Sequence, residues 1–127
     1  MAGAKGGRKL ILAVDDEESL RDLYETQIPM LGYDVRVASG AGEARSLLRK
    51  KVPDLILMDV MMGEEDGLSL TRELRADPRT SRVPIIIVSA LTDAASLSDA
   101  MLFGATDYVT KPFDTGILKA KLERALG

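Results

Sequence analysis

The sequence contains no cysteine and no histidine among its 127 residues. Without cysteine there is no disulfide and no thiolate ligand, and without histidine there is no imidazole to act as a base or to bind a metal. A zinc centre with thiolate or imidazole ligands and a Ser-His-Asp triad are therefore excluded. Any metal site must use oxygen ligands, which favours a hard cation such as Mg²⁺.

Long apolar segments are also absent. No apolar run reaches the roughly 18 residues that a membrane-spanning helix requires, and no signal peptide is visible. We therefore expect a cytoplasmic protein that does not enter a membrane. The formal net charge is −3, from 17 basic and 20 acidic residues, which argues against non-specific binding to nucleic acid or anionic membranes.

What the sequence does contain is a fivefold alternation of short apolar runs and amphipathic segments. Strands are predicted over Leu10–Val14, Tyr33–Ala38, Leu55–Met58, Pro84–Val88 and Asp107–Thr110. Helices are predicted over Glu17–Leu31, from Ala41 to before Val52, and over Gly67–Ala76, Thr92–Phe103 and Asp114–Leu126. We expect Pro29 to end or bend the first helix, because proline lacks the N–H that a helix needs.

Strands that alternate with helices over short connections predict an α/β fold with a parallel sheet, because right-handed crossovers place helices on both faces. The fold class is thus a doubly wound (βα)5 sandwich of one domain. We expect residues 1–8, which are rich in Gly, Ala, Lys and Arg, to be a flexible leader and residues 9–127 to be the folded domain.

Four of the predicted strands end in side chains that can do chemistry. Asp15 and Asp16 follow the first strand, and Asp59, Ser89 and Lys111 follow three others. Because the carboxyl ends of parallel strands share one edge of the sheet, we expect these residues to converge there. Clustered carboxylates repel one another and stay ionised only around a cation, which predicts a site for a hard cation such as Mg²⁺.

The residues around these positions resemble the signature of bacterial response-regulator receiver domains. The matching stretches are Val14–Glu17, Leu57–Met62, Asp66-Gly67, Ser89-Ala90 and Gly104–Phe113. They have the order and spacing of that family, and the resemblance extends from about Lys9 to the end of the chain. It implies a flavodoxin-like, five-stranded parallel sheet in the order 2-1-3-4-5.

The resemblance also implies a role for each site residue. Asp59 is expected to be the phosphorylation site, with Lys111 and Ser89 contacting the phosphoryl group. Mg²⁺ is expected to bind Asp16, Asp59 and the backbone carbonyl of Met61, while Asp15 acts mainly through a metal-bound water. Ser89 and Tyr108 are expected to form the switch, and a cis Lys111-Pro112 bond is expected to direct the Lys111 ammonium toward Asp59.

The partners are implied in the same way. The phosphoryl donor would be a sensor histidine kinase or a histidine phosphotransfer protein, so the domain would be a phosphoacceptor that assists its own reactions rather than an enzyme. The helix Thr92–Phe103, the strand Asp107–Thr110 and the final helix would form the output face, which binds a downstream protein or a second copy. We expect this domain to bind neither nucleic acid nor a membrane.

Other functions on this fold remain open at this point. A phosphohydrolase of the haloacid-dehalogenase type has an Asp two residues after its nucleophile, where this chain has Met61. A flavodoxin-like FMN site needs a polar phosphate loop after the first strand, where Asp15, Asp16 and Glu17 would repel the anion. A pseudo-receiver would lack the acidic and basic set that is present. One departure from the family is Gly63, which stands where proline is common and is followed by two acidic residues.

Overall fold

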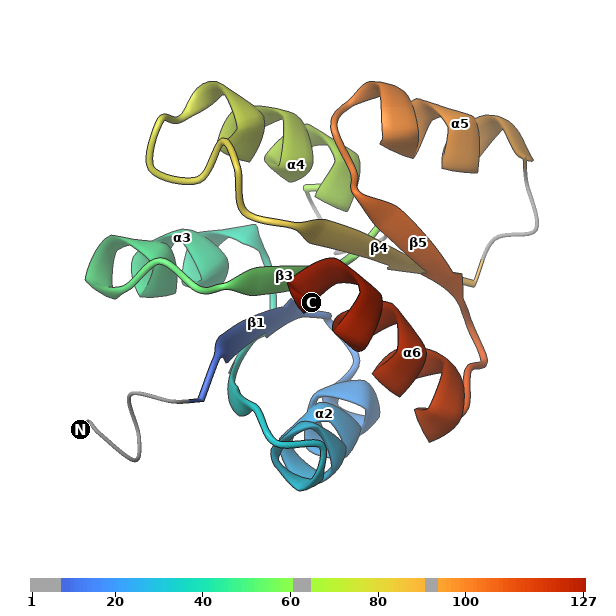
Figure 1. Ribbon diagram of the computed structural model, residues 1–127. Helices are drawn as coiled ribbons and strands as arrows, with labels where there is room; N and C mark the ends of the chain where they lie inside the picture. The colour runs from blue at the N-terminus through green and yellow to red at the C-terminus, as the bar shows by residue number, and fades with distance from the viewer. Residues whose placement is uncertain (1–7, 61–64, 91–93) are drawn as a thin grey trace.

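The computed structural model describes residues 8–60, 65–90 and 94–127. In these parts of the chain, strands and helices alternate (Figure 1). The strands are β1 (Leu10–Val14), β2 (Asp34–Ala38), β3 (Leu55–Asp59), β4 (Ile85–Ser89) and β5 (Asp107–Thr110). The helices are α2 (Glu18–Met30), α3 (Ala41–Lys50), α4 (Gly67–Ala76), α5 (Ala94–Leu102) and α6 (Thr115–Leu126).

All strand pairs are parallel, and the sheet order is β2-β1-β3-β4-β5. The predicted fold class and strand order are therefore confirmed. Strand β1 lies second in the sheet, with β2 on one side of it and β3, β4 and β5 following in turn on the other. The direction in which strands are added to the sheet therefore reverses between β1 and β3. Parallel α/β sheets bind ligands at the carboxyl ends of the strands beside such a reversal.

The helices cover the sheet in two layers (Figure 1). Helices α2 and α6 lie on one face, and α3, α4 and α5 lie on the other. Side chains of successive strand residues point to opposite faces, so each central strand contributes to both cores. Leu12, Ile56 and Ile85 belong to the core beneath α3 and α4, whereas Ile11, Leu57 and Ile86 belong to the core beneath α2 and α6.

Strand β2 is an edge strand, and its sequence alternates between apolar Val35 and Val37 and charged Asp34 and Arg36. Its residues Asp34–Val37 are partly or fully exposed, while every residue of β1, β3 and β4 is buried. Arg8, the last residue of the predicted leader, donates hydrogen bonds to Asp34 Oδ1 at 3.0 Å and to the Tyr33 carbonyl at 3.0 Å. Residues 1–7 of that leader lie outside the described residues.

The helix ends follow local side-chain chemistry. Asp66 caps α4 by accepting from the Ser69 N–H at 2.6 Å, and Asp114 caps α6 by accepting from the Ile117 N–H at 2.8 Å. Helix α2 ends at Met30, one residue after Pro29. Gly104 follows α5 with φ of 109°, a left-handed conformation that favours glycine. Thr92, the predicted start of α5, lies outside the described residues. No described helix is long and apolar enough to cross a membrane.

Candidate functional site

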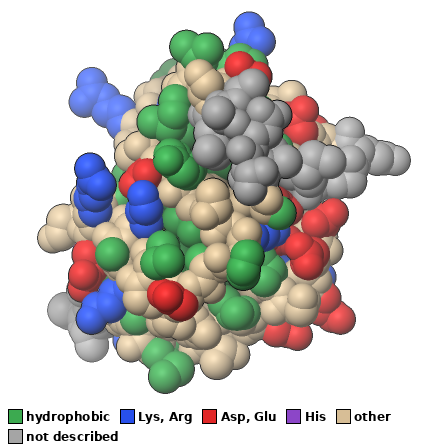
Figure 2. Space-filling model, turned by 90° about the vertical axis from the view of Figure 1, so that its right-hand side faces the viewer, with side chains coloured by type: hydrophobic (Ala, Val, Ile, Leu, Met, Phe, Trp, Pro, Cys, Tyr) green, Lys and Arg blue, Asp and Glu red, His purple; other side chains and the backbone are tan. Residues whose placement is uncertain are grey.

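The candidate site lies at the carboxyl edge of the sheet. The labelled strands in Figure 1 point toward the right, and Figure 2 looks onto that side of the molecule. Acidic side chains gather on one side of this view, next to hydrophobic ones. The predicted site residues Asp15, Asp16, Asp59, Ser89 and Lys111 all lie in strand ends or in the residues that follow them.

The register of the sheet brings Asp15 and Asp59 to the same level. Val14 pairs with Met58, so the next residues of β1 and β3 face each other across neighbouring strands. Both residues continue the odd-numbered series whose members Ile11, Ala13, Leu55 and Leu57 lie in the core under α2 and α6. Strand alternation therefore directs both carboxylates to the same face of the sheet, and both are buried.

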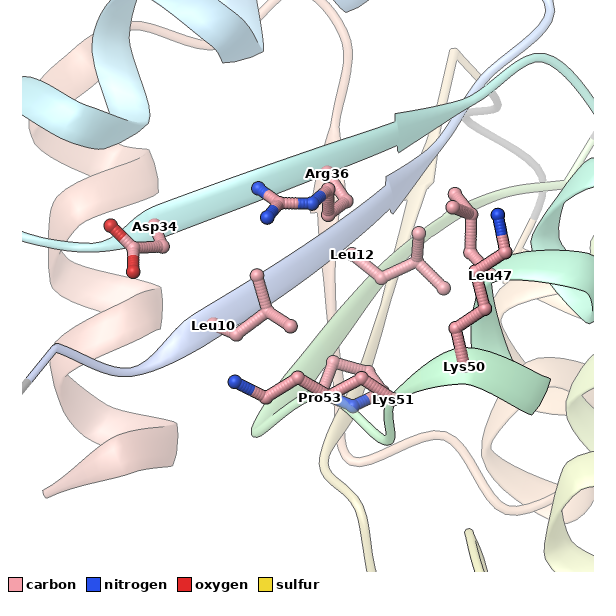
Figure 3. A pocket seen from close by; sticks show the side chains of 8 residues that line it. All are labelled: Leu10, Leu12, Asp34, Arg36, Leu47, Lys50, Lys51 and Pro53. Atoms are coloured by element: carbon pink, nitrogen blue, oxygen red, sulfur yellow. The ribbon is translucent and has the colours of Figure 1, made fainter. Parts of the chain in front are cut away.

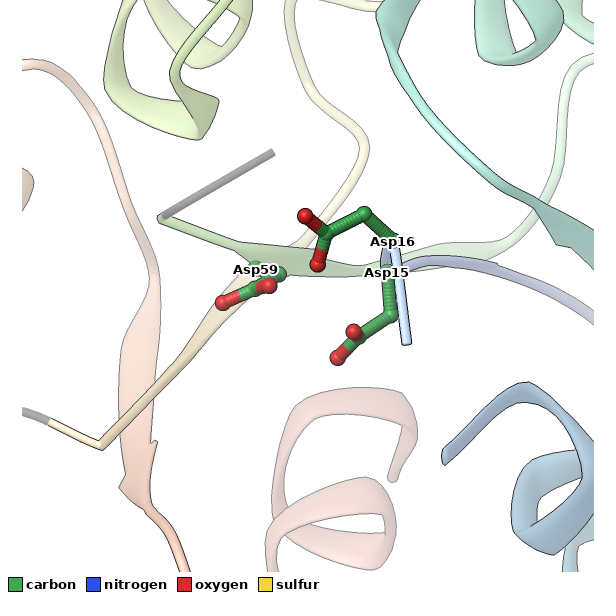
Figure 4. A group of neighbouring side chains, drawn as sticks. All are labelled: Asp15, Asp16 and Asp59. Atoms are coloured by element: carbon green, nitrogen blue, oxygen red, sulfur yellow. The ribbon is translucent and has the colours of Figure 1, made fainter. Parts of the chain in front are cut away.

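Asp16 completes a cluster of three carboxylates. One oxygen from each of Asp15, Asp16 and Asp59 lies within 4.8 Å of the others. Figure 4 shows the three side chains around one point, with Asp16 entering from the side opposite Asp15. Asp16 is exposed, whereas Asp15 has 0% exposure and Asp59 has 4%. Three acids this close favour a bound cation, and their oxygen donors suit Mg²⁺.

The basic residue of the site is Lys111, which follows β5. Its ammonium nitrogen lies 3.1 Å from Asp15 Oδ2, 3.5 Å from Asp59 Oδ1 and 3.4 Å from Glu17 Oε1. The Lys111-Pro112 peptide bond is cis, as the resemblance implied. Lys111 is thus the counter-charge of a largely buried acidic group.

The surroundings of Lys111 favour its charged form. Burial by itself lowers the pKa of a lysine, but the hydrogen bond to Asp15 and the negative charge of Asp59 outweigh burial. The pKa of Lys111 therefore lies above its ordinary value. An ammonium that stays protonated can neutralise an anion that arrives at Asp59.

Ser89 ends β4 one residue beyond Val88, which pairs with Asp59. It is 2% exposed, and its carbonyl accepts from the Lys111 N–H at 2.7 Å. Ser89 therefore lies between the ends of β3 and β5, at the level of Thr110, its partner in β5.

Gly67 supports the site in a way that the sequence analysis did not predict. Gly67 opens α4 directly against the main chain of Asp59, where a Cβ would lie 2.0 Å from the Asp59 carbonyl oxygen. Only glycine fits this approach. The Asp66-Gly67 pair gave a signal in the sequence, but the contact with Asp59 requires the fold.

The sequence also did not predict the hydrogen bonds that hold Asp15. The Glu17 N–H donates to Asp15 Oδ1 at 2.9 Å, and the Arg21 guanidinium donates to the Asp15 carbonyl at 2.8 Å. Both carboxylate oxygens of Asp15 are therefore engaged, one by Glu17 and the other by Lys111. The acidic run Asp15–Glu17 was visible in the sequence, but the direction of each side chain was not.

A ring contact with α2 also supports the loop after β5. The rings of Phe113 and Tyr24 stack with centroids 6.2 Å apart and planes 10° from parallel. Burial, together with the charges of Asp15 and Asp59, raises the pKa of the Tyr24 hydroxyl, so it stays protonated. Tyr24 is an apolar support for the loop that carries Lys111.

The predicted switch residue Tyr108 lies on β5 with 39% of its surface exposed. Lys121 of α6 places its ammonium 5.4 Å from the centre of the Tyr108 ring and 2.9 Å from Asp107 Oδ1. The aromatic ring thus points outward in this structure and carries a cation over its face.

A separate hollow of about 270 Å³ lies at the other end of the sheet, between β1, β2 and the end of α3 (Figure 3). In this view Arg36 and Lys51 lie on either side of Leu10. Lysines at a helix C-terminus complement its dipole, and a basic residue on an edge strand discourages strand pairing. These ordinary roles account for the charges, so we place no site there.

The structure therefore brings Asp15, Asp16, Asp59 and Lys111 together, with Ser89 beside them. Tyr108 lies on β5, three residues before Lys111. The predicted carbonyl ligand of Met61 lies outside the described residues, as does Gly63.

Comparisons with known proteins identify the family and the fold. A family model described as the response regulator receiver domain matches residues 11–123. The probable transcriptional regulator ycf27 of Guillardia theta is 40% identical over 119 residues, which cover 94% of this chain and 46% of that protein. The DNA-binding regulator RpaA of Synechocystis is 34% identical, with coverage of 91% and 48%. The chain spans about half the length of the curated relatives it matches.

Solved structures resemble the whole domain. A response regulator of Chloroflexus aurantiacus has a TM-score of 0.89 at 30% identity, with coverage of 94% of this chain and 98% of that one. The receiver domain of a sensor histidine kinase from Pseudomonas aeruginosa has a TM-score of 0.87 at 32% identity, with coverage of 95% and 99%. That structure was solved with a magnesium ion coordinated in its active site cleft.

Proposed function

The chain belongs to the response regulator receiver domain family, and from that membership we propose that it is a phosphoacceptor switch in which Asp59 receives the phosphoryl group. The observation that carries this proposal is the Lys111 ammonium, 3.5 Å from Asp59 Oδ1 at a cluster of three carboxylates. A carboxylate nucleophile needs such positive charge beside it, because the incoming phosphoryl group is anionic.

In the proposed reaction a carboxylate oxygen of Asp59 attacks the phosphorus of a phosphohistidine. The new O–P bond forms as the P–N bond breaks, and the electron pair of that bond stays on the imidazole nitrogen. The product is an aspartyl phosphate, from which water later releases inorganic phosphate and the free carboxylate. Lys111 contributes positive charge near the phosphoryl oxygens, and Ser89 donates a hydrogen bond from its hydroxyl.

The acidic cluster fits Mg²⁺. We assign the side chains of Asp16 and Asp59 and the backbone carbonyl of Met61 as its direct protein ligands. Asp15 has both oxygens engaged within the protein, which supports a role through a metal-bound water. Bound Mg²⁺ would neutralise charge on the transferring phosphoryl group. Asp16 is exposed, so it can turn toward a cation without breaking a buried contact.

We propose a sensor histidine kinase or a histidine phosphotransfer protein as the phosphoryl donor, with both proteins in the cytoplasm. Such a domain acts on itself rather than turning over an external substrate. Its output face is made by α5, β5 and α6, where Met101, Leu102, Tyr108 and Ile117 are exposed. This face would bind a downstream protein or a second copy, and Ser89 with Tyr108 would couple it to Asp59. Residues 9–127 form the receiver domain, and residues 1–8 are its leader.

The test is to incubate the protein with Mg²⁺ and acetyl phosphate or phosphoramidate and to measure its intact mass. We expect a gain of one phosphate that is stable to acid and labile to base. Asp59→Asn should abolish this gain, because the amide cannot act as the nucleophile, while Asp22→Asn, an exposed control on α2, should keep it. Labelling of Asp59→Asn at another residue would contradict the assignment.

A further inference from the structure

Arg45 of α3 binds two carboxylates from different parts of the chain. It bonds Glu73 of α4 through two nitrogens, with Nε 2.9 Å from Oε2 and Nη2 2.7 Å from Oε1. It also bonds Glu65 through Nη1, 3.1 Å from Oε1, and through Nη2 to Oε2. The hydrogen bond from Arg45 holds the pKa of Glu73 below its ordinary value.

Glu65 begins a short segment that is fixed residue by residue and leads to the phosphoacceptor. Asp66 caps α4 through the Ser69 N–H. Gly67 donates from its N–H to the Val60 carbonyl at 2.8 Å, and its Cα lies against the carbonyl of Asp59. Residues 65–67 therefore connect a side-chain anchor on α3 to the main chain of Asp59.

We propose that Arg45 is a positioning residue for the phosphoacceptor site, holding the segment Glu65–Gly67 against Asp59. This inference rests on the function proposed above. The Gly67 N–H bonds the Val60 carbonyl, and the Gly67 Cα lies against the Asp59 carbonyl, so the Arg45 anchor holds a segment that contacts the main chain at the nucleophile. Loss of the anchor then widens the range of positions that the Asp59 main chain and the Val60 carbonyl sample.

The geometry supports more than an incidental surface ion pair. Arg45 and Glu65 are each partly buried, with 31% and 39% side-chain exposure. A guanidinium that bonds two carboxylates with several nitrogens has a defined orientation, which a lysine cannot reproduce. Exposed single ion pairs contribute little to stability, so the expected consequence is positional rather than a large loss of folding free energy.

A purely electrostatic role would have a different signature. Arg45→Ala makes the neighbourhood of the site more negative, which by charge alone strengthens Mg²⁺ binding. Glu65→Ala makes it more positive, which by charge alone weakens Mg²⁺ binding. A positioning role predicts that both substitutions weaken binding, because each breaks the same anchor.

The experiment measures the Mg²⁺ dissociation constant and the rate of Asp59 labelling by acetyl phosphate in the full chain. We expect Arg45→Ala and Glu65→Ala each to weaken Mg²⁺ binding and slow labelling by about three- to tenfold, less than the roughly 10- to 100-fold that follows loss of a group bonded directly to a metal ligand. The double variant should lose no more than the single variants. Arg49→Ala and Glu25→Ala make the same charge changes at exposed positions and should stay within about twofold of the wild type.

Folding is followed in parallel by the melting temperature, with Arg45→Lys as a second variant that keeps the charge. If Arg45→Ala is too unstable to measure, Arg45→Lys and Glu65→Ala decide the matter, and both should show the loss. Opposite effects of the Arg45 and Glu65 substitutions, or unchanged Mg²⁺ binding and labelling in both, would overturn the inference. A wild-type protein that neither binds Mg²⁺ nor accepts phosphate would instead overturn the proposed function.

Discussion

Asp15 and Asp16 are neighbours in the site, but they differ in burial and in the contacts that they make within the protein. Asp15 is fully buried, and both its carboxylate oxygens have partners in the protein. Asp16 is exposed at the rim of the same cluster. Removing Asp15 would leave Lys111 without its nearest partner, while removing Asp16 takes away only one of three mutually repelling charges.

Asp16→Ala should therefore separate metal binding from folding. Without Mg²⁺ we expect its free energy of unfolding to equal or slightly exceed that of the wild type, because repulsion within the cluster is relieved. With free Mg²⁺ at a hundred times the dissociation constant, the wild type should gain about 2.7 kcal/mol by mass action. The variant should gain much less, as measured by thermal melts with and without Mg²⁺. Equal protection of both proteins would place the cation elsewhere.

Gly67 is a second position where one residue controls the site. In Gly67→Ala the new Cβ would lie 2.0 Å from the Asp59 carbonyl oxygen, so the main chain at Asp59 or α4 must move. We expect a loss of about 1–3 kcal/mol, as for overpacking in a core, and slower labelling of Asp59. The loss of stability is measured by chemical denaturation, and the rate of labelling is measured by intact mass.

Gly42 of α3 provides the matched control for this substitution. A Cβ at Gly42 has no heavy atom within 4 Å, so Gly42→Ala should leave stability unchanged or raise it by about 0.5–1 kcal/mol. If Gly67→Ala also behaved in this way, the close approach of α4 to Asp59 would have no energetic importance.

Residue identities were predictable from the sequence, but most contacts between them were not. The apolar strands that lead to Asp15 and Asp59 are visible as patterns, because burial on both faces requires unbroken apolar runs. The pairing of Lys111 with Asp15 depends on the register between strands far apart in the chain. Arg45 and Glu65 are 20 residues apart, and nothing in their local sequence indicates that they meet.

At the scale of helices and strands, the predicted elements are all present and their ends differ by a few residues. The predicted range of α4 matches the structure at both ends, where Asp66 caps the helix and Asp77-Pro78 follows it. Helix α2 continues to Met30 although Pro29 is in its last turn. A proline there removes only one late hydrogen bond, so it is tolerated one residue before the helix ends.

The contact between α6 and β5 gives a prediction about the output face. Lys121 lies over the exposed ring of Tyr108 and bonds Asp107, so it stabilises the outward position of the ring. If the proposed switch moves this ring inward, Lys121→Ala lowers the cost of that movement. An exposed cation–π contact is worth about 0.5–1 kcal/mol, so we expect the apparent dissociation constant for beryllofluoride to fall roughly two- to fivefold.

Lys119→Ala is the control for that measurement, because Lys119 is exposed on the same helix. It should leave beryllofluoride affinity unchanged. The same affinity in Lys121→Ala and the wild type would show that Lys121 does not hold Tyr108 in one state. The affinity is measured by titration of beryllofluoride in the presence of Mg²⁺.

The two ends of the parallel sheet carry different charged side chains. Acidic side chains and Lys111 lie at the carboxyl edge, while Arg36, Lys50 and Lys51 surround the hollow at the opposite end. The fold class could be read from the sequence because five strand–helix repeats admit few topologies. Right-handed crossovers and this strand order place α2 on one face and α3, α4 and α5 on the other. The face that α6 covers became clear only in the structure, since no strand follows this helix in the sheet.

Long-range coupling from Asp59 to the output face is the prediction that belongs to the molecule as a whole. Ser89 lies one residue beyond the level of Asp59 and pairs with Thr110, two residues after Tyr108. A phosphoryl group that draws the Ser89 hydroxyl and the Lys111 ammonium therefore pulls on the ends of β4 and β5 together. Ligands shift such an equilibrium only by their different contacts in the two states, and we expect Ser89 and Lys111 to supply those contacts.

Amide chemical shifts with and without beryllofluoride test this coupling. We expect changes around Asp59 and also along β5 and in α6, because the ends of β4 and β5 are joined by the bond from the Lys111 N–H to the Ser89 carbonyl. In Tyr108→Ala the changes around Asp59 should remain while those in α6 shrink, since the ring between β5 and Lys121 is gone. Shift changes that stop at Ser89 in the wild type would mean that the site and the α5–β5–α6 face are energetically independent.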